Sequence, residues 1–466
     1  MRRLSRRLLV SLTATALAVA AACGDGSDSS DSADASCPVE ALESAEGPVE
    51  ITFWHAQQAE NERVLQELVA QFEAEEPRVQ VNLVNQVAYP DLFGKYTAAL
   101  AGTGELPDLA QMEDISVQEL VDSESTVPAE ACVEADGYDL SDYLPRTLEF
   151  YSTEGVLRAM PWNVSNVVLI YNKSAFERAG LDPERPPTTL EELEEYSQQI
   201  VDTGAAPNAM ALHVEPYTIE YLYATSGEEF VNNGNGRDER ATETQIDSAV
   251  GAEIWSWWND MVSSGLAINT GSQSNNYDHL FALGNQQVAM TFEASGVLGS
   301  VEAVLASGEF GGVEIGVGAL PGVEAEGSVP VGDGSLWIPR ASSPAKKAAA
   351  WEFIKFLNEP AQQAALSVGS QGGYVPVRRS AVEEPALQSL WEQKSWPSLL
   401  FDQLDSGPIT PASIGPVMGD YQGVRNALRD GFVRMLVGDA SPEDAMAETQ
   451  VEATELIRGY NDRIGG

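Results

Sequence analysis

Basic residues, histidines and cysteines are scarce in this chain of 466 residues. Lysine and arginine together number 26 against 71 aspartates and glutamates, which gives a formal net charge of −45. This charge argues against nucleic acid or an anionic membrane surface as a partner, because both would repel the protein. A hydrophobic content of 43% nevertheless indicates a folded protein, and the length predicts two or three domains.

Motifs of catalysis and metal binding are also missing. The sequence has no HExxH, P-loop, GxSxG or CxxC motif and no His/Cys cluster with the spacing of metal ligands. His55, His213 and His279 form no pattern. We therefore expect no catalytic residue, no cofactor and no metal. The alternative is a secreted carbohydrate-active hydrolase that uses two of the many carboxylates at a set separation.

The N-terminus has the features of an export signal. Four arginines lie within the first seven residues and precede the apolar run Leu8–Ala22, which is too short for a membrane-spanning helix. The segment LAVAAAC resembles a bacterial lipoprotein signal of the actinobacterial type, although Ala20 stands where leucine is usual. The resemblance implies removal of residues 1–22, a diacylglyceryl and palmitate lipid on Cys23, and anchoring to the outer face of the cell membrane.

An acidic, serine-rich stretch follows, and we interpret residues 23–47 as a flexible tether. If Cys23 carries lipid, Cys37 and Cys132 are the remaining cysteines. Two cysteines in an exported protein predict one disulfide, which would attach the tether to the first part of the fold. The alternative is a pair of buried free thiols.

Strands and helices alternate in the first part of the folded region. The predicted elements are the strands Val49–Trp54, Val79–Val84 and Leu106–Met112 and the helices Asn61–Glu75 and Tyr89–Ala101. This order predicts an α/β fold with right-handed βαβ units and a parallel sheet. Ligands bind beyond the carboxyl ends of such strands, so the turns His55–Gln57, Gln86–Tyr89 and Met112–Asp114 are expected on one rim.

The rest of the chain is predicted from the same patterns. Residues Pro187–Gly284 read as mainly helical, and a helix at Ala252–Val262 carries three tryptophans that we expect in the core. Three further strands are predicted at Asn285–Ser295, Val313–Leu320 and Gly332–Ile338. Helices are predicted after Ser343-Pro344 and at Ala445–Tyr460.

The stretch Met160–Leu181 connects these parts. A polar run leads into the continuous apolar strand Val167–Tyr171, which suits burial on both faces, and a short helix that ends at Gly180 follows. On its residues alone this is equally an ordinary loop–strand–helix unit. The stretch MPWNVSNVVLIYNKSAFERAGL and its continuation resemble the extracellular solute-binding proteins of ABC importers, in the carbohydrate-type family. Members that bind glycerol-3-phosphate, glycerophosphodiesters or oligosaccharides share the most features.

The resemblance implies a two-lobed periplasmic-binding-protein-like fold of type II, in which each lobe is a sheet flanked by helices and a multi-strand hinge joins them. The implied division places residues 48–162 and 289–334 in the N-terminal lobe and residues 163–288 and 335–466 in the C-terminal lobe. The implied function is capture of a sugar, oligosaccharide or glycerol-3-phosphate-type solute by hinge closure, and delivery to ABC permease subunits. We expect a monomer that performs no catalysis.

The resemblance also implies a set of ligand-binding residues, two of which come from the first interlobe crossing and the others from the loops around it. They are Tyr89, Glu113, Asn163, Ser165, Tyr217, Ser295, Gly332, Tyr374 and Arg425. Arg425 is implied to hold a phosphate, but a surface salt bridge explains it equally well. Val214 and Tyr217 occupy the region where the glycerol-3-phosphate members have two tryptophans. A neutral sugar stacked on Tyr217, Tyr221 and Tyr223 is therefore an equal alternative.

Overall fold

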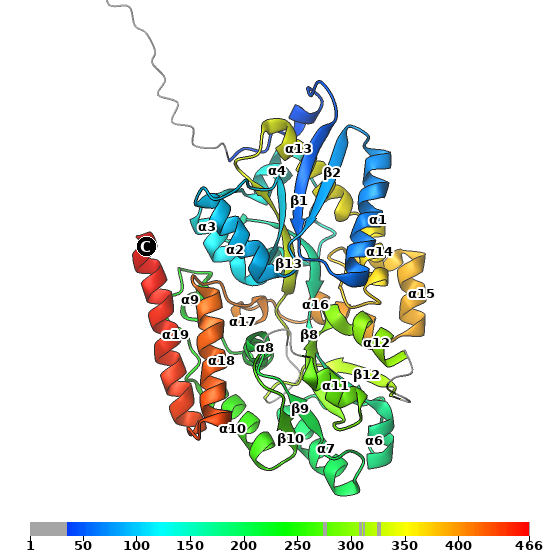
Figure 1. The fold of residues 1–466 in the computed structure, drawn as a ribbon, viewed down its shortest axis with the longest axis vertical. Helices are drawn as coiled ribbons and strands as arrows, with labels where there is room; N and C mark the ends of the chain where they lie inside the picture. Colours follow the sequence, from blue (N-terminus) through cyan, green and yellow to red (C-terminus); the bar gives the residue numbers. More distant parts are fainter. Residues whose placement is uncertain (1–34, 274–276, 307–309, 311–312, 324–327, 466) are drawn as a thin grey trace, which may run out of the picture. The chain divides into compact units, whose positions relative to one another are not determined.

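The computed structural model of the protein describes residues 35–273, 277–306, 310, 313–323 and 328–465. The export signal, Cys23 and the first part of the tether lie outside the described residues. From Ala35 onward the chain forms one compact unit built on two mixed sheets (Figure 1). Within the described ranges, no helix has both the length and the apolar composition needed to cross a membrane.

The first sheet contains the predicted parallel strands and lies in the upper part of Figure 1. Its strands are β1 (Val49–His55), β2 (Val79–Asn85), β3 (Leu109–Glu113), β4 (Thr126–Val127), β7 (Met160–Ser165) and β13 (Gly332–Pro339). Strand β1 pairs in parallel with β2 and with β3, which confirms the predicted βαβ arrangement. Strand β13 is antiparallel to β3 and to β7.

The second sheet lies in the lower part of Figure 1 and has the order β10-β9-β11-β8-β12. Its strands are β8 (Val167–Asn172), β9 (Met210–Leu212), β10 (Ala267–Asn269), β11 (Met290–Ala294) and β12 (Ile315–Ala319). Every residue of β8 is buried, as its continuous apolar sequence predicts. Strands β9 and β10 are short elements within the stretch that reads as mainly helical. A separate hairpin joins β5 (Ser152–Thr153) to β6 (Val156–Leu157).

Helices cover both sheets. The first sheet is flanked by α1 (Ala59–Glu75), α2 (Tyr89–Leu100), α13 (Pro344–Leu357) and, beside α1, α14 (Pro360–Gly369). The second sheet is flanked by α6 (Lys173–Ala179), α7 (Leu190–Thr203), α10 (Ala249–Ser263), α11 (Asp278–Gly284) and α16 (Trp396–Asp405). The remaining α-helices are α3 (Val117–Asp122), α4 (Ala129–Asp136), α5 (Pro145–Phe150), α8 (Pro216–Thr225), α9 (Asn232–Gly236), α12 (Leu298–Ala306), α15 (Pro385–Gln393), α17 (Pro411–Ile414), α18 (Tyr421–Val437) and α19 (Pro442–Ile464).

Strand pairing corrects where the later segments lie. Strand β11 was expected in the N-terminal lobe, but it pairs with β8 and β9 in the second sheet. Most of β13 and all of α13 were expected in the C-terminal lobe, but β13 pairs with β3 and α13 packs on β1. The physical reason is that backbone hydrogen bonding, which the apolar pattern of a strand does not encode, decides the sheet to which each strand belongs.

The chain crosses between the sheets at two sites that lie close together. Strand β7 belongs to the first sheet and β8 to the second, with Asn166 alone between them. The return crossing runs from β12 to β13. Asn166 also ties the crossing to neighbouring segments, since its carbonyl accepts from the backbone N–H of Ser295 at 2.7 Å and its side chain donates to the carbonyl of Leu400 at 3.0 Å.

Two expectations about the core are confirmed. Cys37 and Cys132 form a disulfide that closes a sequence separation of 95 residues, so the free-thiol alternative is wrong. On α10, Trp255 and Trp258 are completely buried and Trp257 is 8% exposed. The indole rings of Trp255 and Trp258 both contact Phe432 of α18, so these tryptophans pack helices together.

Candidate functional site

Polar side chains meet where β3, β7 and β13 lie side by side. The amide of Gln111 on β3 donates to the hydroxyl of Tyr89 at 2.8 Å and to Asn163 Oδ1 on β7 at 2.9 Å. Asn163 Nδ2 in turn donates to the Tyr89 hydroxyl at 3.0 Å. The other end of the Gln111 amide is also fixed, because its Oε1 accepts from the backbone N–H of Ala56 at 2.9 Å. The structure thus brings the predicted residues Tyr89 and Asn163 together through Gln111, which sequence reasoning missed.

Strand β13 runs through this cluster as Gly332-Asp333-Gly334. In the β-ladders, Gly332 lies opposite Ser165, and Gly334 lies opposite both Asn163 and Glu113. Both glycines are needed for space. A Cβ on Gly334 would lie 2.2 Å from Asn163 Oδ1 and 2.8 Å from the Tyr89 hydroxyl, and one on Gly332 would lie 2.7 Å from the hydroxyl of Tyr221.

Asp333, between the two glycines, is the main residue that sequence reasoning missed. Its backbone has φ 69°, a left-handed conformation that aspartate adopts more readily than most residues. The nearby hydroxyl of Ser165 favours the charged form of its carboxyl and so opposes the increase in its pKa that burial causes. A Cβ built on Gly296 would lie 3.1 Å from Asp333 Oδ2 and 3.1 Å from the ring of Tyr374, so the carboxylate and that ring lie on either side of Gly296. The signal in the sequence was the Gly-Asp-Gly run itself.

Arg425 on α18 is a buried side chain, so the expectation of a surface salt bridge is wrong. Its Nη2 lies 2.8 Å from Glu220 Oε2, and its Nε donates to Glu220 Oε1 at 3.0 Å. The guanidinium also lies 3.5 Å from Glu113 and 3.8 Å from Asp114. One arginine therefore faces three carboxylates, and its fork is already occupied by Glu220.

The tyrosines proposed as stacking platforms lie in different surroundings. The hydroxyl of Tyr217 donates to Glu293 at 2.8 Å, and Glu293 also lies 2.8 Å from Nε2 of His279. Tyr221 is 4% exposed and points its hydroxyl at Gly332. The prediction that Tyr223 stacks on a sugar is wrong, because its side chain is completely buried and its hydroxyl donates to the carbonyl of Ile246.

Ser295 lies between the crossing at Asn166 and Gly373, the residue before Tyr374. Ser295 is completely buried, and its hydroxyl donates to the carbonyl of Gly373 at 2.7 Å while it accepts from the backbone N–H of Asn166 at 3.1 Å. Its polar atom is therefore engaged in joining the crossing to the turn before Tyr374. The Tyr374 hydroxyl donates to Gln57 Oε1 at 3.4 Å. The turns at His55–Gln57, Gln86–Tyr89 and Met112–Asp114 do converge on this rim, as predicted.

The carboxyls in this cluster ionise less readily than usual. Burial raises the pKa of Glu113 and of Asp114 to about 7 in spite of the nearby Arg425 guanidinium. Burial likewise raises the pKa of Asp333 to about 7, and the charges of Asp114 and Glu293 add to the effect. Burial also acts to raise the pKa of Glu293, but the hydrogen bond and charge of His279, together with hydrogen bonds from the Ala294 N–H and the Tyr217 hydroxyl, hold that pKa below its usual value. Near neutral pH, Glu113, Asp114 and Asp333 are therefore partly protonated.

The family of bacterial extracellular solute-binding proteins matches residues 67–394, which is more than half of the chain. The chain belongs to this family. Its fold and the convergence of side chains on an interlobe crossing agree with that assignment. Among the described residues, no group of three His, Cys, Asp or Glu side chains is arranged to hold a metal ion.

Named relatives of this solute-binding protein are themselves binding proteins rather than enzymes. The sn-glycerol-3-phosphate-binding periplasmic protein UgpB of Rhizobium meliloti (strain 1021) is 28% identical over 410 residues, which covers 86% of this chain and 92% of the relative. The protein of the same name from Escherichia coli O6:K15:H31 (strain 536 / UPEC) is 23% identical over 427 residues, covering 90% and 95%.

Solved structures establish the two-lobed fold. UgpB from Mycobacterium tuberculosis in complex with glycerophosphocholine superposes with a TM-score of 0.73 at 21% identity, covering 90% of this chain and 99% of that structure. The GacH receptor of Streptomyces glaucescens GLA.O, solved without ligand and with acarbose, superposes with a TM-score of 0.72 at 23% identity, covering 89% and 100%. The protein thus has the predicted fold class, and its family membership makes it a solute-binding protein.

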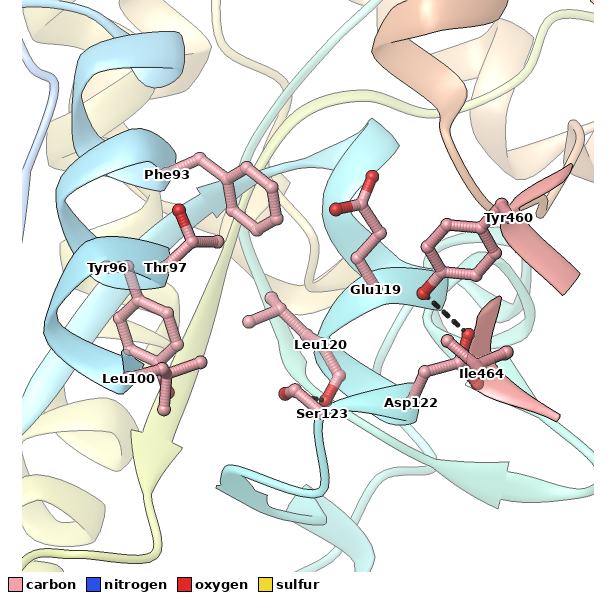
Figure 2. A pocket seen from close by; sticks show the side chains of 10 residues that line it. All are labelled: Phe93, Tyr96, Thr97, Leu100, Glu119, Leu120, Asp122, Ser123, Tyr460 and Ile464. Carbon is pink, nitrogen blue, oxygen red and sulfur yellow. Dashed lines mark hydrogen bonds between the residues drawn. The ribbon is translucent and has the colours of Figure 1, made fainter. Parts of the chain in front are cut away.

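Away from the cluster, a hydrogen bond joins α3 to α19. Asp122 at the end of α3 accepts a hydrogen bond from the hydroxyl of Tyr460 on α19 at 2.8 Å, which Figure 2 shows. The guanidinium of Arg240 also donates to Asp122, at 2.6 and 2.9 Å. A mainly apolar pocket of about 250 Å³ lies beside this contact and is lined by residues that include Phe93 and Leu120. None of the residues predicted to bind ligand lines it.

Proposed function

We propose that this solute-binding protein captures a small polyhydroxylated solute at the junction of its two sheets and delivers it to an ABC permease. The observation that carries the proposal is the convergence of Tyr89, Asn163 and Gln111 with Gly332 and Gly334 beside the β7–β8 crossing. Ligand contacts to both lobes at a crossing couple binding to hinge closure, because a ligand shifts a conformational equilibrium by its differential affinity for the two states.

The lobes in this proposal follow the two sheets. The N-terminal lobe consists of β1 to β7 with β13, α13 and α14, and the C-terminal lobe consists of β8 to β12 with α16, α18 and α19. The hinge then has three crossings, which lie at Asn166, between β12 and β13, and between α14 and α16. This division differs from the one implied by the sequence resemblance in the placement of β11, β13 and α13.

Two solute classes are supported by the relatives. The UgpB proteins are named for binding glycerol-3-phosphate, and the structure from Mycobacterium tuberculosis contains glycerophosphocholine. The GacH receptor was solved with acarbose, a sugar-like ligand. For this chain, the surroundings of Arg425 weigh against a terminal phosphate as the main anchor, because Glu220 occupies the guanidinium fork and Glu113 lies 3.5 Å from it. A solute whose hydroxyls donate to carboxylates fits better.

The remaining features of the proposal concern location and partners. Cys23 is proposed as the lipid attachment site, and the acidic segment before Cys37 as a tether that keeps the folded unit near the membrane. The predicted tether was too long, because Cys37 is held by the disulfide and Val39–Leu42 form a short helix that packs on α13 with Leu42 buried. The solute and the permease subunits are the partners, and the protein acts as a monomer. The cycle requires binding, closure and release, with no catalysis, cofactor or metal.

The test is a thermal-shift screen of the purified protein against maltose, trehalose, glycerol-3-phosphate and glycerophosphocholine. A ligand present at a thousand times its Kd stabilises the folded state by about 4 kcal/mol, which raises Tm by several degrees. Each solute that raises Tm is then studied by small-angle X-ray scattering, and we expect compaction on binding. Tight binding without compaction would contradict hinge closure, and sugar cleavage without stable binding would favour the hydrolase alternative.

A further inference from the structure

The surroundings of Asp333 define the charge of the solute more narrowly than the proposed function does. Asp333 makes no salt bridge to any described lysine, arginine or histidine, and the group that favours its charged form is the nearby hydroxyl of Ser165. The other charges that act on it are the carboxylates of Asp114 and Glu293, which repel its negative charge. Asp333 therefore has a carboxyl without a positive partner in a half-buried position, and a bound cation would stabilise its charged form.

Tyrosines surround this carboxylate. Tyr151 donates its hydroxyl to the Asp333 carbonyl at 3.2 Å, and the Tyr374 ring and the Asp333 carboxylate both approach Gly296 closely. The hydroxyls of Tyr89 and Tyr221 lie against the glycines on either side of Asp333. The faces of aromatic rings carry negative potential and attract cations, most strongly when the cation is desolvated. Tyrosine rings beside a carboxylate are thus suited to a cationic group.

Tyr221 is a second side chain of the cluster that can meet a solute. Its ring is 4% exposed, and its hydroxyl is not among the fully buried polar atoms of the described residues that lack a hydrogen bond. The hydroxyl lies close to Gly332, on the same side of the site as Ser165. The Tyr221 hydroxyl is therefore placed to accept from an N–H or O–H of a bound solute next to Asp333.

We propose that Asp333, with the tyrosines around it, is a subsite for a positively charged nitrogen, so that the solute is an amine-bearing or quaternary-ammonium derivative of a sugar or glycerol compound. This inference rests on the proposed function, because it assigns a charge to the solute of that same site. Neutral hydroxyls would solvate the carboxylate without cancelling its charge, and an added phosphate would meet Asp333, Asp114 and Glu293 together. A cation forms an ion pair where the protein supplies none.

The experiment uses two pairs of solutes that differ in this one charge. Isothermal titration calorimetry at pH 7.5 compares 2-amino-2-deoxytrehalose (trehalosamine) with trehalose, and glycerophosphocholine with glycerophosphoglycerol. In each pair only one member carries a positively charged nitrogen, and both members of the second pair also carry one phosphodiester charge. We expect the member with the positive nitrogen to bind at least tenfold more tightly than its counterpart in at least one pair. Equal or tighter binding of the member without the nitrogen in both pairs, or binding of maltose with no binding of trehalosamine or glycerophosphocholine, would overturn the inference and leave the proposed function intact.

The variant Asp333→Asn then assigns the preference to this carboxylate. Asparagine has the same shape and tolerates the left-handed backbone conformation, so the fold should be retained. We expect Asp333→Asn to remove the preference for the solute with the positive nitrogen, while the affinity for its counterpart without that nitrogen changes by less than about threefold. The matched control is Asp430→Asn, which removes the same charge from an exposed position on α18 and should keep the preference. A preference that survives Asp333→Asn contradicts the assignment.

Failure of the proposed function gives a different result. If the folded wild-type protein binds neither member of either pair nor any solute of the thermal-shift screen, the junction is not a solute site and both proposals fall. Binding of any uncharged solute with compaction keeps the proposed function, whatever happens to the charge assignment.

Discussion

Arg425 and Glu220 form a bidentate ion pair inside the protein, with Nε 3.0 Å from one carboxylate oxygen and Nη2 2.8 Å from the other. The hydroxyl of Tyr421 also donates to Glu220, at 3.1 Å. The pair joins α18 to α8, while Glu113 and Asp114 approach the same guanidinium from the first sheet. Arg425 is thus the positive centre that holds several carboxylates in one place.

Replacing Arg425 by alanine should destabilise the fold strongly. Removing one partner of a buried pair leaves an uncompensated charge and costs about 3–5 kcal/mol. The measurement is urea unfolding followed by circular dichroism. Arg458→Ala is the control, because Arg458 forms its ion pair with Glu243 at the surface and should matter far less. Unchanged stability of Arg425→Ala together with lost binding of a phosphate ester would instead make Arg425 an anion site.

Stability should increase as the pH is lowered moderately from the alkaline side. The pKa values of Glu113, Asp114 and Asp333 are raised to about 7 by burial, so the folded state binds more protons than the unfolded chain between about pH 4 and pH 7. Their contribution to stability is present at low pH and is lost as the pH rises through 7. We expect the Tm of the ligand-free protein to be higher at about pH 6 than at about pH 8.

His55 limits this gain at more acidic pH. Burial lowers its pKa to about 4, so its contribution to stability is present above pH 6.5 and is lost as the pH falls toward 4. Tm should therefore pass through a maximum in the weakly acidic range. The double variant Glu113→Gln with Asp333→Asn should flatten the alkaline side of the profile. A Tm that rises steadily up to pH 8 in the wild-type protein would contradict the assignment.

The sequence predicts the strands of this fold better than it predicts how they assemble. Strand β8 is predicted from five consecutive apolar residues, and all of its residues are buried. Strands β9 and β10 have three residues each, too few to show an alternating pattern. The assignment of β11 and β13 to sheets depends on long-range backbone pairing, which no local pattern records.

The candidate site shows the same limit. Tyr89 and Asn163 were predicted from the family resemblance, whereas the residue that joins them, Gln111, lies within a strand whose sequence gives no functional signal. Asp333 could not be distinguished in the sequence from the many other acidic residues. Its proposed role depends on its neighbours in space. Arg425 was recognised as a candidate. Its partner Glu220 is 205 positions away in sequence, so the ion pair that occupies the guanidinium was not predictable from spacing.

The Cys37–Cys132 disulfide should contribute substantially to stability. It closes a loop with a sequence separation of 95 residues, and removing a native disulfide from a small secreted domain typically costs about 2–5 kcal/mol. The double variant Cys37→Ser with Cys132→Ser should therefore unfold at lower urea concentration. Neither cysteine is among the proposed ligand contacts, so we expect solute affinity to be retained in the folded fraction. Equal urea midpoints for the wild-type protein and the variant would contradict this prediction.

The contact between Asp122 and Tyr460 should favour the closed conformation. It links α3, next to the first sheet, to α19, which packs on α18 and α10 (Figure 2). A net hydrogen bond to a charged group contributes about 1.5–3 kcal/mol, so Tyr460→Phe should weaken solute binding roughly tenfold or more if that contact forms on closure. Tyr171→Phe is the control, because its hydroxyl bonds to the carbonyl of Pro183 within one lobe. Equal affinities of the two variants would show that the contact does not report closure.

Gly334 provides the most direct test that the cluster around β13 is the binding site. The added Cβ of Gly334→Ala would lie 2.2 Å from Asn163 Oδ1 and 2.9 Å from Gln111 Nε2, so the network that fixes Tyr89 must shift. Overpacking of this kind costs about 1–3 kcal/mol, which the whole protein should tolerate. Solute binding should nevertheless be lost, because the displaced groups are the proposed ligand contacts. Gly47→Ala is the matched control, since nothing lies within 4 Å of its Cβ position. Calorimetry on both variants, with Tm as the measure of folding, checks the prediction, and wild-type affinity in Gly334→Ala would place the solute elsewhere.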